Sequence, residues 1–250
     1  MQQSDIKVGI VGYGVIGSTF SRWLKEHTSC QQAISDPPKG INEDLNGCNV
    51  FFIGIHIPTE TDGTQDLTLL KQIISGLPMA PVFIRTTLLP GTTDKLTKEL
   101  GRPVYFMPEF LTERTAYADF CSQDVVITGE KDLMDTIFAT KKRLYMSNIE
   151  AELTKYAHNV FGAVAVTYFN GIYDLCQKEG ADYEKVRQGV LLSGYIAPTH
   201  SHVPGPDGKF GYGGKCFPKD VNAFTQYASD RPIFPVLDAV IEANKIFRKE

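Results

Sequence analysis

Hydrophobic residues in roughly the first 150 positions form short runs that alternate with segments of helical spacing. Runs rich in β-branched and aromatic residues predict strands at 6–11, 31–35, 49–57, 82–85, 104–107 and 125–128. Apolar residues at helical spacing predict helices at 15–25 and 66–76, and Gly76 and Pro78 end the second of these. Strands that alternate with helices predict a parallel sheet with helices on both of its faces.

The pattern changes near residue 150. Residues 150–178 contain no proline, and their apolar side chains recur at helical spacing, which predicts one long, largely buried helix. Further helices are predicted at 183–192, 218–227 and 233–248, and a glycine-rich loop at 204–214. We therefore expect an α/β protein with a Rossmann-type doubly wound parallel sheet over 1–145. A smaller all-helical domain, over 146–250, is expected to follow it.

Composition narrows the class of protein. The 250 residues are 42% hydrophobic and 22% charged, which is typical of a globular chain. The net charge of -4 argues against a nucleic-acid binder, because such proteins carry an excess of basic residues. The apolar runs are too short to span a bilayer. Residues 1–5 contain no basic region of a signal peptide. The 5 cysteines include no CxxC pair, so we expect reduced thiols and a cytoplasmic protein.

The segment GYGVIG directly follows the first predicted strand and opens the first predicted helix. In this motif Gly12 allows a tight turn, Gly14 lets the backbone approach a pyrophosphate, and Gly17 allows close helix packing. Asp36 ends the second predicted strand, where an acidic side chain binds a ribose 2′-hydroxyl and repels a 2′-phosphate. The context favours NAD as cofactor over NADP. The alternative is a tight turn that binds no ligand.

A second motif, GYGGKCFPKD, occupies residues 211–220. Cys216 comes after a glycine loop and just before a predicted helix, whose positive end would favour a thiolate together with Lys215 and Lys219. Asp220 shares a helix face with Cys216. We therefore expect Cys216 to be a nucleophile. The other four cysteines are expected to be small buried side chains: Cys30, Cys48, Cys121 and Cys176.

Three polar residues of the long predicted helix share one face: Glu152, Lys155 and Asn159. Polar groups that face inward need polar partners or a substrate. From the spacing alone, a solvated stripe is the favoured interpretation. The pair His200 and His202 has no acidic or cysteine ligands nearby, so we expect no metal site.

Six segments together resemble the UDP-glucose/GDP-mannose dehydrogenase family. They are KVGIVGYGVIG (7–17), IPT (57–59), RTTLLPGT (85–92), MPEFLTE (107–113), AELTKYAHNVFGA (151–163) and GYGGKCFPKD (211–220). The resemblance covers nearly the whole chain, and the first and last of these segments carry the chemistry described above. It implies oxidation of the C6 alcohol of a nucleotide sugar to a carboxylate, with two NAD consumed per turnover.

The resemblance also implies roles for individual residues. Cys216 would be the covalent nucleophile, which captures an aldehyde as a thiohemiacetal that is then oxidised to a thioester. Lys155 and Asn159 would hold the developing oxyanion. Glu109 would act in general acid–base catalysis and in hydrolysis of the thioester.

Two further catalytic residues follow from the resemblance. Asp220 would orient a water molecule or Lys155, and Thr87 would lie near the nicotinamide. The expected cofactor-binding residues are Gly12, Gly14, Val15, Ile16, Gly17, Asp36, Pro58, Thr59, Thr87, Glu109 and Lys219.

The chain departs from the family pattern in four places. It ends at Glu250, where the family leads into a third domain that grips the nucleotide, so we expect that domain to be absent. Residues 193–202 lack the arginine of the family's Asp-x-Arg-Ile stretch, MPEF replaces NPEF, and Lys215 stands where a serine is frequent. The expected partners are a sugar substrate, a second copy bound through the central helices, and a separate chain that replaces the third domain.

Two other functions stay open from the sequence. A two-electron β-hydroxyacid dehydrogenase also joins a Rossmann unit to a helical domain and uses a Lys-x-x-x-Asn pair, but it needs no cysteine. A non-catalytic NAD-binding module would bind the cofactor without turnover. The presence of Glu109, Lys155, Asn159, Cys216 and Asp220 favours the sugar dehydrogenase.

Overall fold

The computed structural model describes residues 2–249, which pack as two compact units. The first unit runs to Pro58 and resumes over Gln65–Lys155. The second comprises Thr59–Thr64 and the described residues from Tyr156 onward. The domain limits expected from the sequence, 1–145 and 146–250, stay a prediction.

The first unit is built on a six-stranded sheet in the order β3-β2-β1-β4-β5-β6. Its strands are β1 (Lys7–Val11), β2 (Gln31–Asp36), β3 (Ile41–Asn42), β4 (Val50–Ile53), β5 (Val82–Ile84) and β6 (Val104–Phe106). All neighbouring pairs are parallel except β2 and β3, which form an antiparallel edge. This order places the carboxyl ends of β1 and β4 side by side, where α/β proteins bind their ligands.

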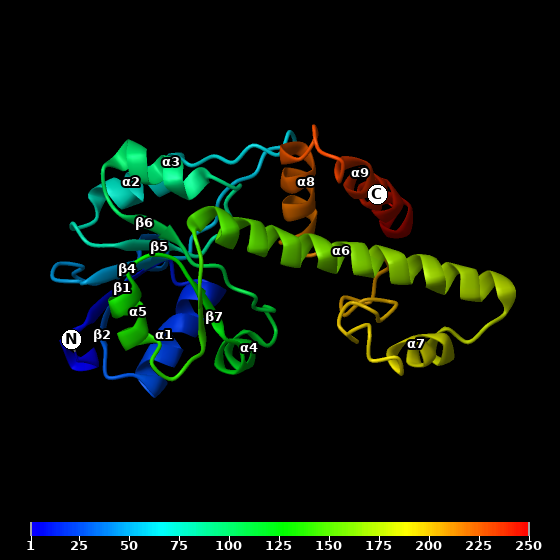
Figure 1. Ribbon diagram of the computed structural model, residues 1–250, viewed down its shortest axis with the longest axis horizontal. Coiled ribbons are helices and arrows are strands. Elements are labelled where there is room, and N and C mark those ends of the chain that lie inside the picture. Colours follow the sequence, from blue (N-terminus) through cyan, green and yellow to red (C-terminus); the bar gives the residue numbers. More distant parts are fainter. Residues whose placement is uncertain (1, 250) are drawn as a thin grey trace. The chain divides into compact units, whose positions relative to one another are not determined.

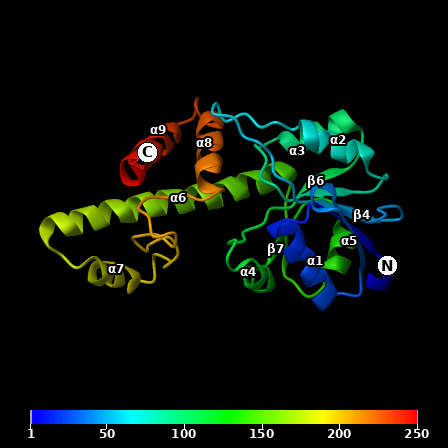
Figure 2. The same ribbon diagram turned by 180° about the vertical axis from the view of Figure 1, so that it is seen from behind.

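Helices cover both faces of this sheet, as the sequence predicts (Figures 1 and 2). On one face lie α2 (Thr68–Gly76) and α3 (Thr92–Leu100), and on the other α1 (Val15–His27), α4 (Ala116–Ser122) and α5 (Lys131–Ile137). Each face has its own apolar core, with Phe20, Trp23 and Phe138 in one and Leu70, Ile74 and Leu96 in the other. The central strands β4 and β5 are buried along their whole length because both faces are covered.

Two predicted strands of this unit form, but each differs from the expectation in one respect. The strand predicted at 49–57 ends at Ile53, because the chain leaves the sheet at Gly54, next to the glycine turn after β1. The strand predicted at 125–128 forms β7 (Val125–Ile127), which pairs in parallel only with the short β8 (Arg143–Tyr145). Short elements such as β8, α4 and α5 span only 3–7 residues, too few for a clear periodicity.

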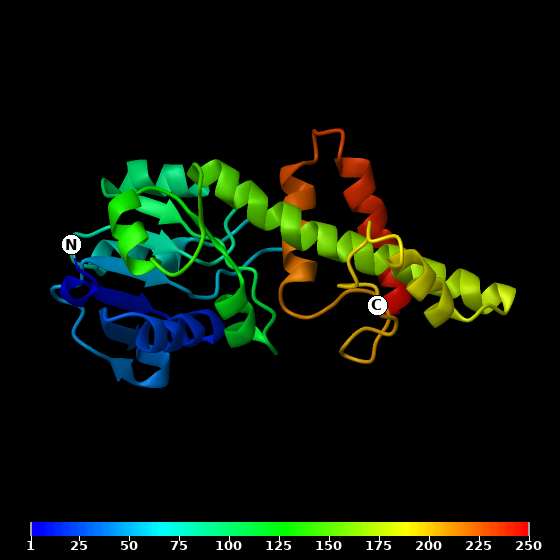
Figure 3. The same ribbon diagram turned by 60° about the horizontal axis from the view of Figure 1, so that its bottom comes forward.

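The second unit is helical. It contains most of α6 (Asn148–Glu179) together with α7 (Tyr183–Leu191), α8 (Phe217–Tyr227) and α9 (Phe234–Arg248). Asp182 caps α7 by accepting hydrogen bonds from the backbone N–H groups of Glu184 and Lys185. A short connection joins α8 to α9, and the two helices pack against each other (Figure 3).

The long helix α6 matches its predicted span but is less buried than expected. Leu153 and Leu175 are 42% and 53% exposed, and Phe161 and Tyr168 are exposed as well. Apolar residues occur on several sides of α6. Within residues 2–249, only some of these sides are buried against other parts of the chain. No helix within residues 2–249, α6 included, is apolar enough over a sufficient length to cross a membrane.

Candidate active site

The glycine turn after β1 is held by contacts between backbone atoms. Gly12 has a φ of +86°, and a Cβ there would lie 2.5 Å from the Gly54 carbonyl oxygen. A Cβ on Gly17 would lie 2.0 Å from the Gly12 carbonyl oxygen. A Cβ on Gly14, in contrast, would meet no atom within 4 Å. The turn therefore closes tightly at Gly12 and Gly17 and leaves space at Gly14, as a pyrophosphate-binding turn requires.

The helix after this turn begins without a side-chain cap. Gly14 is the N-cap of α1, and Val15, Ile16 and Gly17 form its first turn. The first backbone N–H groups of a helix have no partner inside the helix, and the helix dipole adds positive charge there. These groups suit the phosphates of a dinucleotide, so the residues present fit NAD at this position.

Asp36 lies at the carboxyl end of β2 and reaches back to the glycine turn. Its Oδ2 accepts a hydrogen bond of 2.7 Å from the backbone N–H of Tyr13. The Lys39 ammonium lies 3.8 Å from the same oxygen and donates to the Tyr13 carbonyl at 2.6 Å. Lys39 was not singled out from the sequence, although a cation three residues after the acidic residue was visible. Its charge partly offsets the repulsion that Asp36 exerts on a 2′-phosphate.

Two expected cofactor residues follow β4. The Pro58 carbonyl accepts a hydrogen bond from the backbone N–H of Asp66 at 3.0 Å. The Thr59 hydroxyl oxygen is buried and has no hydrogen-bond partner within residues 2–249. A buried hydroxyl without a partner costs free energy, so this position favours a ligand that donates or accepts a hydrogen bond.

Thr87 is buried in the segment that joins β5 to α3. Its carbonyl accepts a hydrogen bond of 3.0 Å from Gln65 Nε2, and Gln65 Oε1 accepts one of 2.9 Å from the backbone N–H of Leu89. The single side chain of Gln65 thus fixes this segment at two points. Sequence reasoning missed Gln65, because its partners lie 22 and 24 residues away.

Lys155 and Glu109 form a buried ion pair in the first unit. Lys155 Nζ lies 3.0 Å from Glu109 Oε1 and also donates to the Glu109 backbone carbonyl. The other carboxylate oxygen of Glu109 accepts a hydrogen bond of 2.7 Å from the backbone N–H of Leu111. Each group of the pair satisfies the other, and removing one would leave a buried charge, at a cost of about 3–5 kcal/mol.

A third charged group is buried near this pair. The guanidinium carbon of Arg85 lies 5.4 Å and 5.2 Å from the ring centres of Phe20 and Phe120. Burial lowers the pKa of Arg85 to about 10, and the negative charge of Glu109 opposes that shift. Two guanidinium nitrogens, Nε and Nη1, have no hydrogen-bond partner within the described residues. The two aromatic rings contribute cation–π stabilisation to this buried cation.

Asn159 and Asp220 form a buried polar pair in the second unit. Asn159 Nδ2 donates to Asp220 Oδ2 at 2.6 Å, and the two side chains come from α6 and α8. The ammonium of Lys219, an expected cofactor residue, contacts the other carboxylate oxygen of Asp220. Asp220 therefore accepts from an amide and a cation at once, which orients the Asn159 amide.

Cys216 is the N-cap of α8, and its side chain is exposed. Pro218 lies in the first turn of the helix, as the sequence predicts. The positive end of α8 favours the thiolate form of a cysteine at this position. Burial raises the pKa of the Cys30 and Cys48 thiols instead, so these two are poor nucleophiles.

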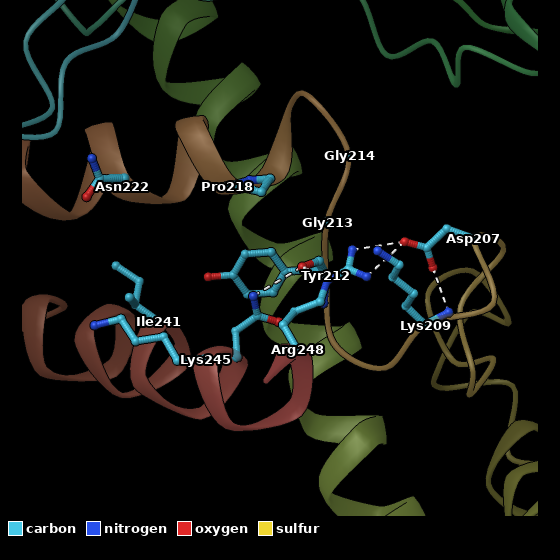
Figure 4. A pocket seen from close by; sticks show the side chains of 11 residues that line it. Asp207, Lys209, Tyr212, Gly213, Gly214, Pro218, Asn222, Ile241, Lys245 and Arg248 are labelled. Carbon is cyan, nitrogen blue, oxygen red and sulfur yellow. Dashed lines mark hydrogen bonds and ion pairs between the residues drawn. The ribbon is translucent and has the colours of Figure 1, made fainter. Parts of the chain in front are cut away.

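Three side chains hold the loop that leads to Cys216. The backbone N–H of Gly211 donates to Asn170 Oδ1 at 2.9 Å, and that of Tyr212 donates to Asn244 Oδ1 at 2.7 Å. The Tyr212 carbonyl accepts from Asn244 Nδ2 and from Arg248 Nε, at 3.1 and 2.9 Å. The anchoring groups come from α6 and α9, and Figure 4 labels Tyr212 and Arg248. The sequence analysis identified none of them.

A cavity of about 410 Å³ lies beside this loop (Figure 4). It is lined by Asp207, Lys209, Tyr212, Gly213, Gly214, Pro218, Asn222, Ile241, Asn244, Lys245 and Arg248. Arg248 pairs with Asp207 at 2.9 Å and fills the space where a Cβ of Gly213 would stand. Cys216 and Asp220 do not line this cavity, which therefore differs from the position of the expected nucleophile.

Two interpretations of the sequence were wrong. Glu152, Lys155 and Asn159 are 0%, 4% and 4% exposed, so they do not form a solvated stripe. Cys121 is exposed at the surface of α4, because the short helix turns that side away from the core.

The two histidines considered as a metal pair lie in different surroundings. The His202 ring contacts the Arg187 guanidinium, and the His200 ring packs against Phe217. Within residues 2–249 no group of three or more His, Cys, Asp or Glu side chains is arranged to hold a metal ion.

Comparisons with known proteins address the family directly. The model of the NAD-binding domain of the UDP-glucose/GDP-mannose dehydrogenase family matches residues 24–149. The model of the central domain of the same family matches residues 149–246. The two matches follow one another along the chain, in the order that the sequence segments predict.

Similar curated proteins agree with this assignment. The chain is 31% identical over 234 residues to the UDP-glucose 6-dehydrogenase of Pseudomonas aeruginosa, covering 83% of this chain and 51% of that protein. It is 31% identical over 221 residues to UDP-glucose 6-dehydrogenase YwqF of Bacillus subtilis, covering 80% and 49%. The chain thus spans about half the length of the curated relatives that it matches.

Among solved structures, the fold resembles a UDP-glucose dehydrogenase from Pyrobaculum islandicum, with a TM-score of 0.83 and 23% identity. That match covers 96% of this chain and 68% of the other. The expected fold class, a parallel Rossmann-like sheet followed by a helical domain, is confirmed. The chain belongs to the UDP-glucose/GDP-mannose dehydrogenase family and carries that family's NAD-binding and central domains.

Proposed function

We propose that the chain oxidises the C6 alcohol of a nucleotide sugar to a carboxylate, with NAD as oxidant and Cys216 as covalent nucleophile. One observation carries the proposal. Cys216 is exposed and stands at the N-cap position of α8, one helical turn before Asp220, whose carboxylate is buried and bonded to Asn159. A two-electron alcohol dehydrogenase has no use for an activated thiol at this position.

The covalent steps follow from the chemistry of a thiol and an aldehyde. Oxidation of the C6 alcohol by two electrons, with loss of its hydroxyl proton, first gives an aldehyde. Cys216 Sγ then bonds to the C6 carbon of the aldehyde, and the carbonyl oxygen gains the thiol proton, which gives a thiohemiacetal. Oxidation of this adduct by two electrons gives a thioester. Water then adds to the thioester, the C–S bond breaks, and the thiol regains a proton as the carboxylate leaves. NAD, when bound, accepts the electron pair in each of the two oxidations.

Lys155 and Asn159 supply the donors for the oxygen that becomes negative in these steps. They lie one turn apart on α6, and each is already held by a carboxylate, Glu109 or Asp220. A cation and an amide that are fixed in advance stabilise an oxyanion without reorganisation during the reaction. Removing one such donor typically slows a reaction by about 10²–10³-fold.

Glu109 is the proposed base for thioester hydrolysis. The Glu109 carboxylate accepts hydrogen bonds from Lys155 and from the Leu111 backbone, and these contacts orient it. In that state it can take a proton from an attacking water molecule. We propose that Thr87 lies next to the nicotinamide, as the family resemblance implies.

The cofactor would be held by the turn and the first helix of the Rossmann sheet. Gly12, Gly14 and Gly17 shape the turn, and the N–H groups at the start of α1 bind the pyrophosphate. Asp36 binds the adenosine ribose. Pro58, Thr59 and Lys219 complete the proposed set, together with Val15 and Ile16 in the first turn of α1.

The first experiment measures NADH and acid formed by the purified protein with NAD. The sugars tested are UDP-glucose, GDP-mannose, UDP-N-acetylhexosamines and simple hexose phosphates. Two NADH per sugar, with a carboxylate as product, supports the proposal and identifies the substrate. One NADH per sugar, with no acid, contradicts it and indicates a two-electron dehydrogenase. NAD binding without turnover of any sugar also contradicts it and indicates a binding module.

A matched pair of variants tests the nucleophile. Cys216→Ala removes the proposed nucleophile, whereas Cys121→Ala removes the other exposed thiol, which lies on α4. We expect the first variant to form no acid and the second to match the wild type. Acid formation by Cys216→Ala would refute the covalent mechanism.

We also propose that two copies associate through α6. Phe161, Tyr168 and Leu175 lie seven residues apart, hence two turns apart, and are 72%, 59% and 53% exposed. Exposed apolar side chains on one side of a long helix favour an interface. Light scattering should give the mass of a dimer for the wild type and of a monomer for Phe161→Glu combined with Tyr168→Glu. A monomeric wild type would refute this interface.

A further inference from the structure

Glu152 is a buried acidic residue of α6 that the proposed reaction does not use. Its side chain has no exposed surface, whereas Glu150 is exposed and bonds to Ser147 at the start of its own helix. Burial of a carboxylate is costly unless hydrogen bonds compensate for the lost water. The position of Glu152 therefore requires specific partners.

Those partners lie at the start of α3. Glu152 Oε2 accepts a hydrogen bond of 2.6 Å from the backbone N–H of Gly91. Glu152 Oε1 accepts from the backbone N–H of Thr93 at 2.9 Å and from the Thr93 hydroxyl at 2.6 Å. Gly91 is the N-cap of α3, has a φ of +84° and no side chain with which to cap the helix. Glu152 supplies the missing cap from another helix, and its charge complements the dipole of α3.

The same segment of chain carries Thr87. It runs from the end of β5 to the start of α3, and Gln65 bonds to Thr87 and Leu89 within it. Glu152 bonds at its far end, to Gly91. The segment is thus held by Gln65 at Thr87 and Leu89 and by Glu152 of α6 at Gly91.

Lys155 follows Glu152 by three residues, so the two side chains project from neighbouring positions on α6. One contacts the start of α3, and the other contacts Glu109 after β6. Two contacts on successive turns fix both the rotation and the axial position of a helix. A change at Glu152 would therefore move the ammonium of Lys155.

We propose that Glu152 is a positioning residue, which locks the first turns of α6 to the start of α3 and so sets the place of Lys155 relative to Thr87. Glu152 itself contacts neither substrate nor cofactor. The roles of Lys155 and Thr87 in this proposal rest on the proposed function. The contact that locks α6 to α3 is independent of that function.

The test compares Glu152→Gln with the matched control Glu150→Gln in the full chain. Glutamine has one acceptor oxygen, and its amide would face a backbone N–H of α3. Nuclear magnetic resonance reports hydrogen exchange at the amides of Gly91 and Thr93 and the ¹⁵N signal of the Lys155 ammonium. In Glu152→Gln we expect exchange about tenfold faster or more at both amides, and a shifted Lys155 signal. Glu150→Gln should leave all three signals unchanged.

Kinetics separate positioning from general loss of stability. Glu152→Gln should lower kcat by about 10²-fold, with the KM values for NAD and sugar unchanged, because the interaction lost matters in the transition state. The same substitution should have no further effect in a Lys155→Ala background. An additive effect there, or an unshifted Lys155 signal in folded Glu152→Gln, would overturn the proposal.

A second variant and a readout that needs no enzymatic activity decide the proposal where Glu152→Gln alone does not. Thr93→Val removes only the hydroxyl donor, so it should give the same changes in smaller degree if Glu152→Gln does not fold. No change in the Lys155 signal of folded Thr93→Val would then overturn the proposal. If the wild type forms no acid, the proposed function fails, and the resonance measurements still decide the lock between α6 and α3.

Discussion

Two glycine turns in this chain lead into helices, and they are held in different ways. The turn at 12–17 precedes α1, and the turn at 211–216 precedes α8. In the first, the close contacts are between backbone atoms of neighbouring strands and the turn itself. In the second, side chains of α6 and α9 bind the backbone of the loop. The first geometry depends on the sheet, the second on helices that are distant in sequence.

This difference separates the cofactor-binding turn from the turn that carries the proposed nucleophile. A change that loosens the anchors of the second turn leaves the sheet and the first turn intact, because no anchor of the second turn belongs to the sheet. The proposed nucleophile, Cys216, is therefore expected to lose its position before the protein loses its cofactor site. Three predictions test this expectation, from the largest effect to the smallest.

Gly17→Ala should abolish NAD binding. Its Cβ would lie 2.0 Å from the Gly12 carbonyl oxygen, and backbone atoms cannot move aside without opening the turn. Overpacking of this kind costs about 1–3 kcal/mol or more. Calorimetric titration with NAD and urea unfolding measure the two effects.

Gly213→Ala is the contrast for that experiment. Its Cβ would meet the end of the Arg248 side chain, 1.3 Å from Nη2, and this flexible group can swing away. We expect NAD affinity to match the wild type and acid formation to fall. Equal loss of NAD affinity in both variants would show that the two turns are not independent.

Asn244→Ala should weaken the second turn alone. The substitution leaves the backbone N–H of Tyr212 buried without its partner and removes one of the two donors to the Tyr212 carbonyl. A buried polar group without a partner costs about 1–3 kcal/mol. Urea unfolding should show that loss, while the affinity for NAD stays that of the wild type. A weaker affinity for NAD would contradict the separation of the two turns.

The second turn also carries a buried ionisable group. Burial raises the pKa of Tyr212 from 10 to about 12, so the folded chain holds this proton more tightly than the unfolded chain. The related stability is fully present below pH 10 and is lost as the pH rises to about 12. Relative to Tyr212→Phe, the wild type should lose about 1–2 kcal/mol of unfolding free energy across this range. Urea unfolding of both proteins checks it, and parallel pH curves would contradict it.

The sequence predicted the local features of both turns well. The glycines of the first turn, Asp36 at the end of β2 and Cys216 at the start of α8 all follow from neighbouring residues and appear as expected. Local patterns have physical causes within one turn or one strand, such as a positive φ or a helix end. Such causes can be identified without knowing the rest of the fold.

The features that could not be predicted depend on contacts between residues that are far apart in the sequence. Asn244 meets Tyr212 across 32 residues, and Glu152 meets Thr93 across 59. The spacing of Glu152 fits a solvated face as well as a buried one, and only packing against α3 decides between them. Cys121 was misjudged for the same reason, because the side of α4 that faces water depends on its contact with α1.

The exposure of Cys121 matters when active sites are counted by chemical labelling. A reagent that modifies accessible thiols should react first with the two exposed cysteines of the five, Cys121 and Cys216, because Cys30 is half-buried and Cys48 and Cys176 are buried. A fast stoichiometry near two per chain would therefore describe an intact preparation, and it would overstate the number of proposed nucleophiles twofold. Replacing Cys121 with serine converts the same titration into a direct count of exposed Cys216 thiols.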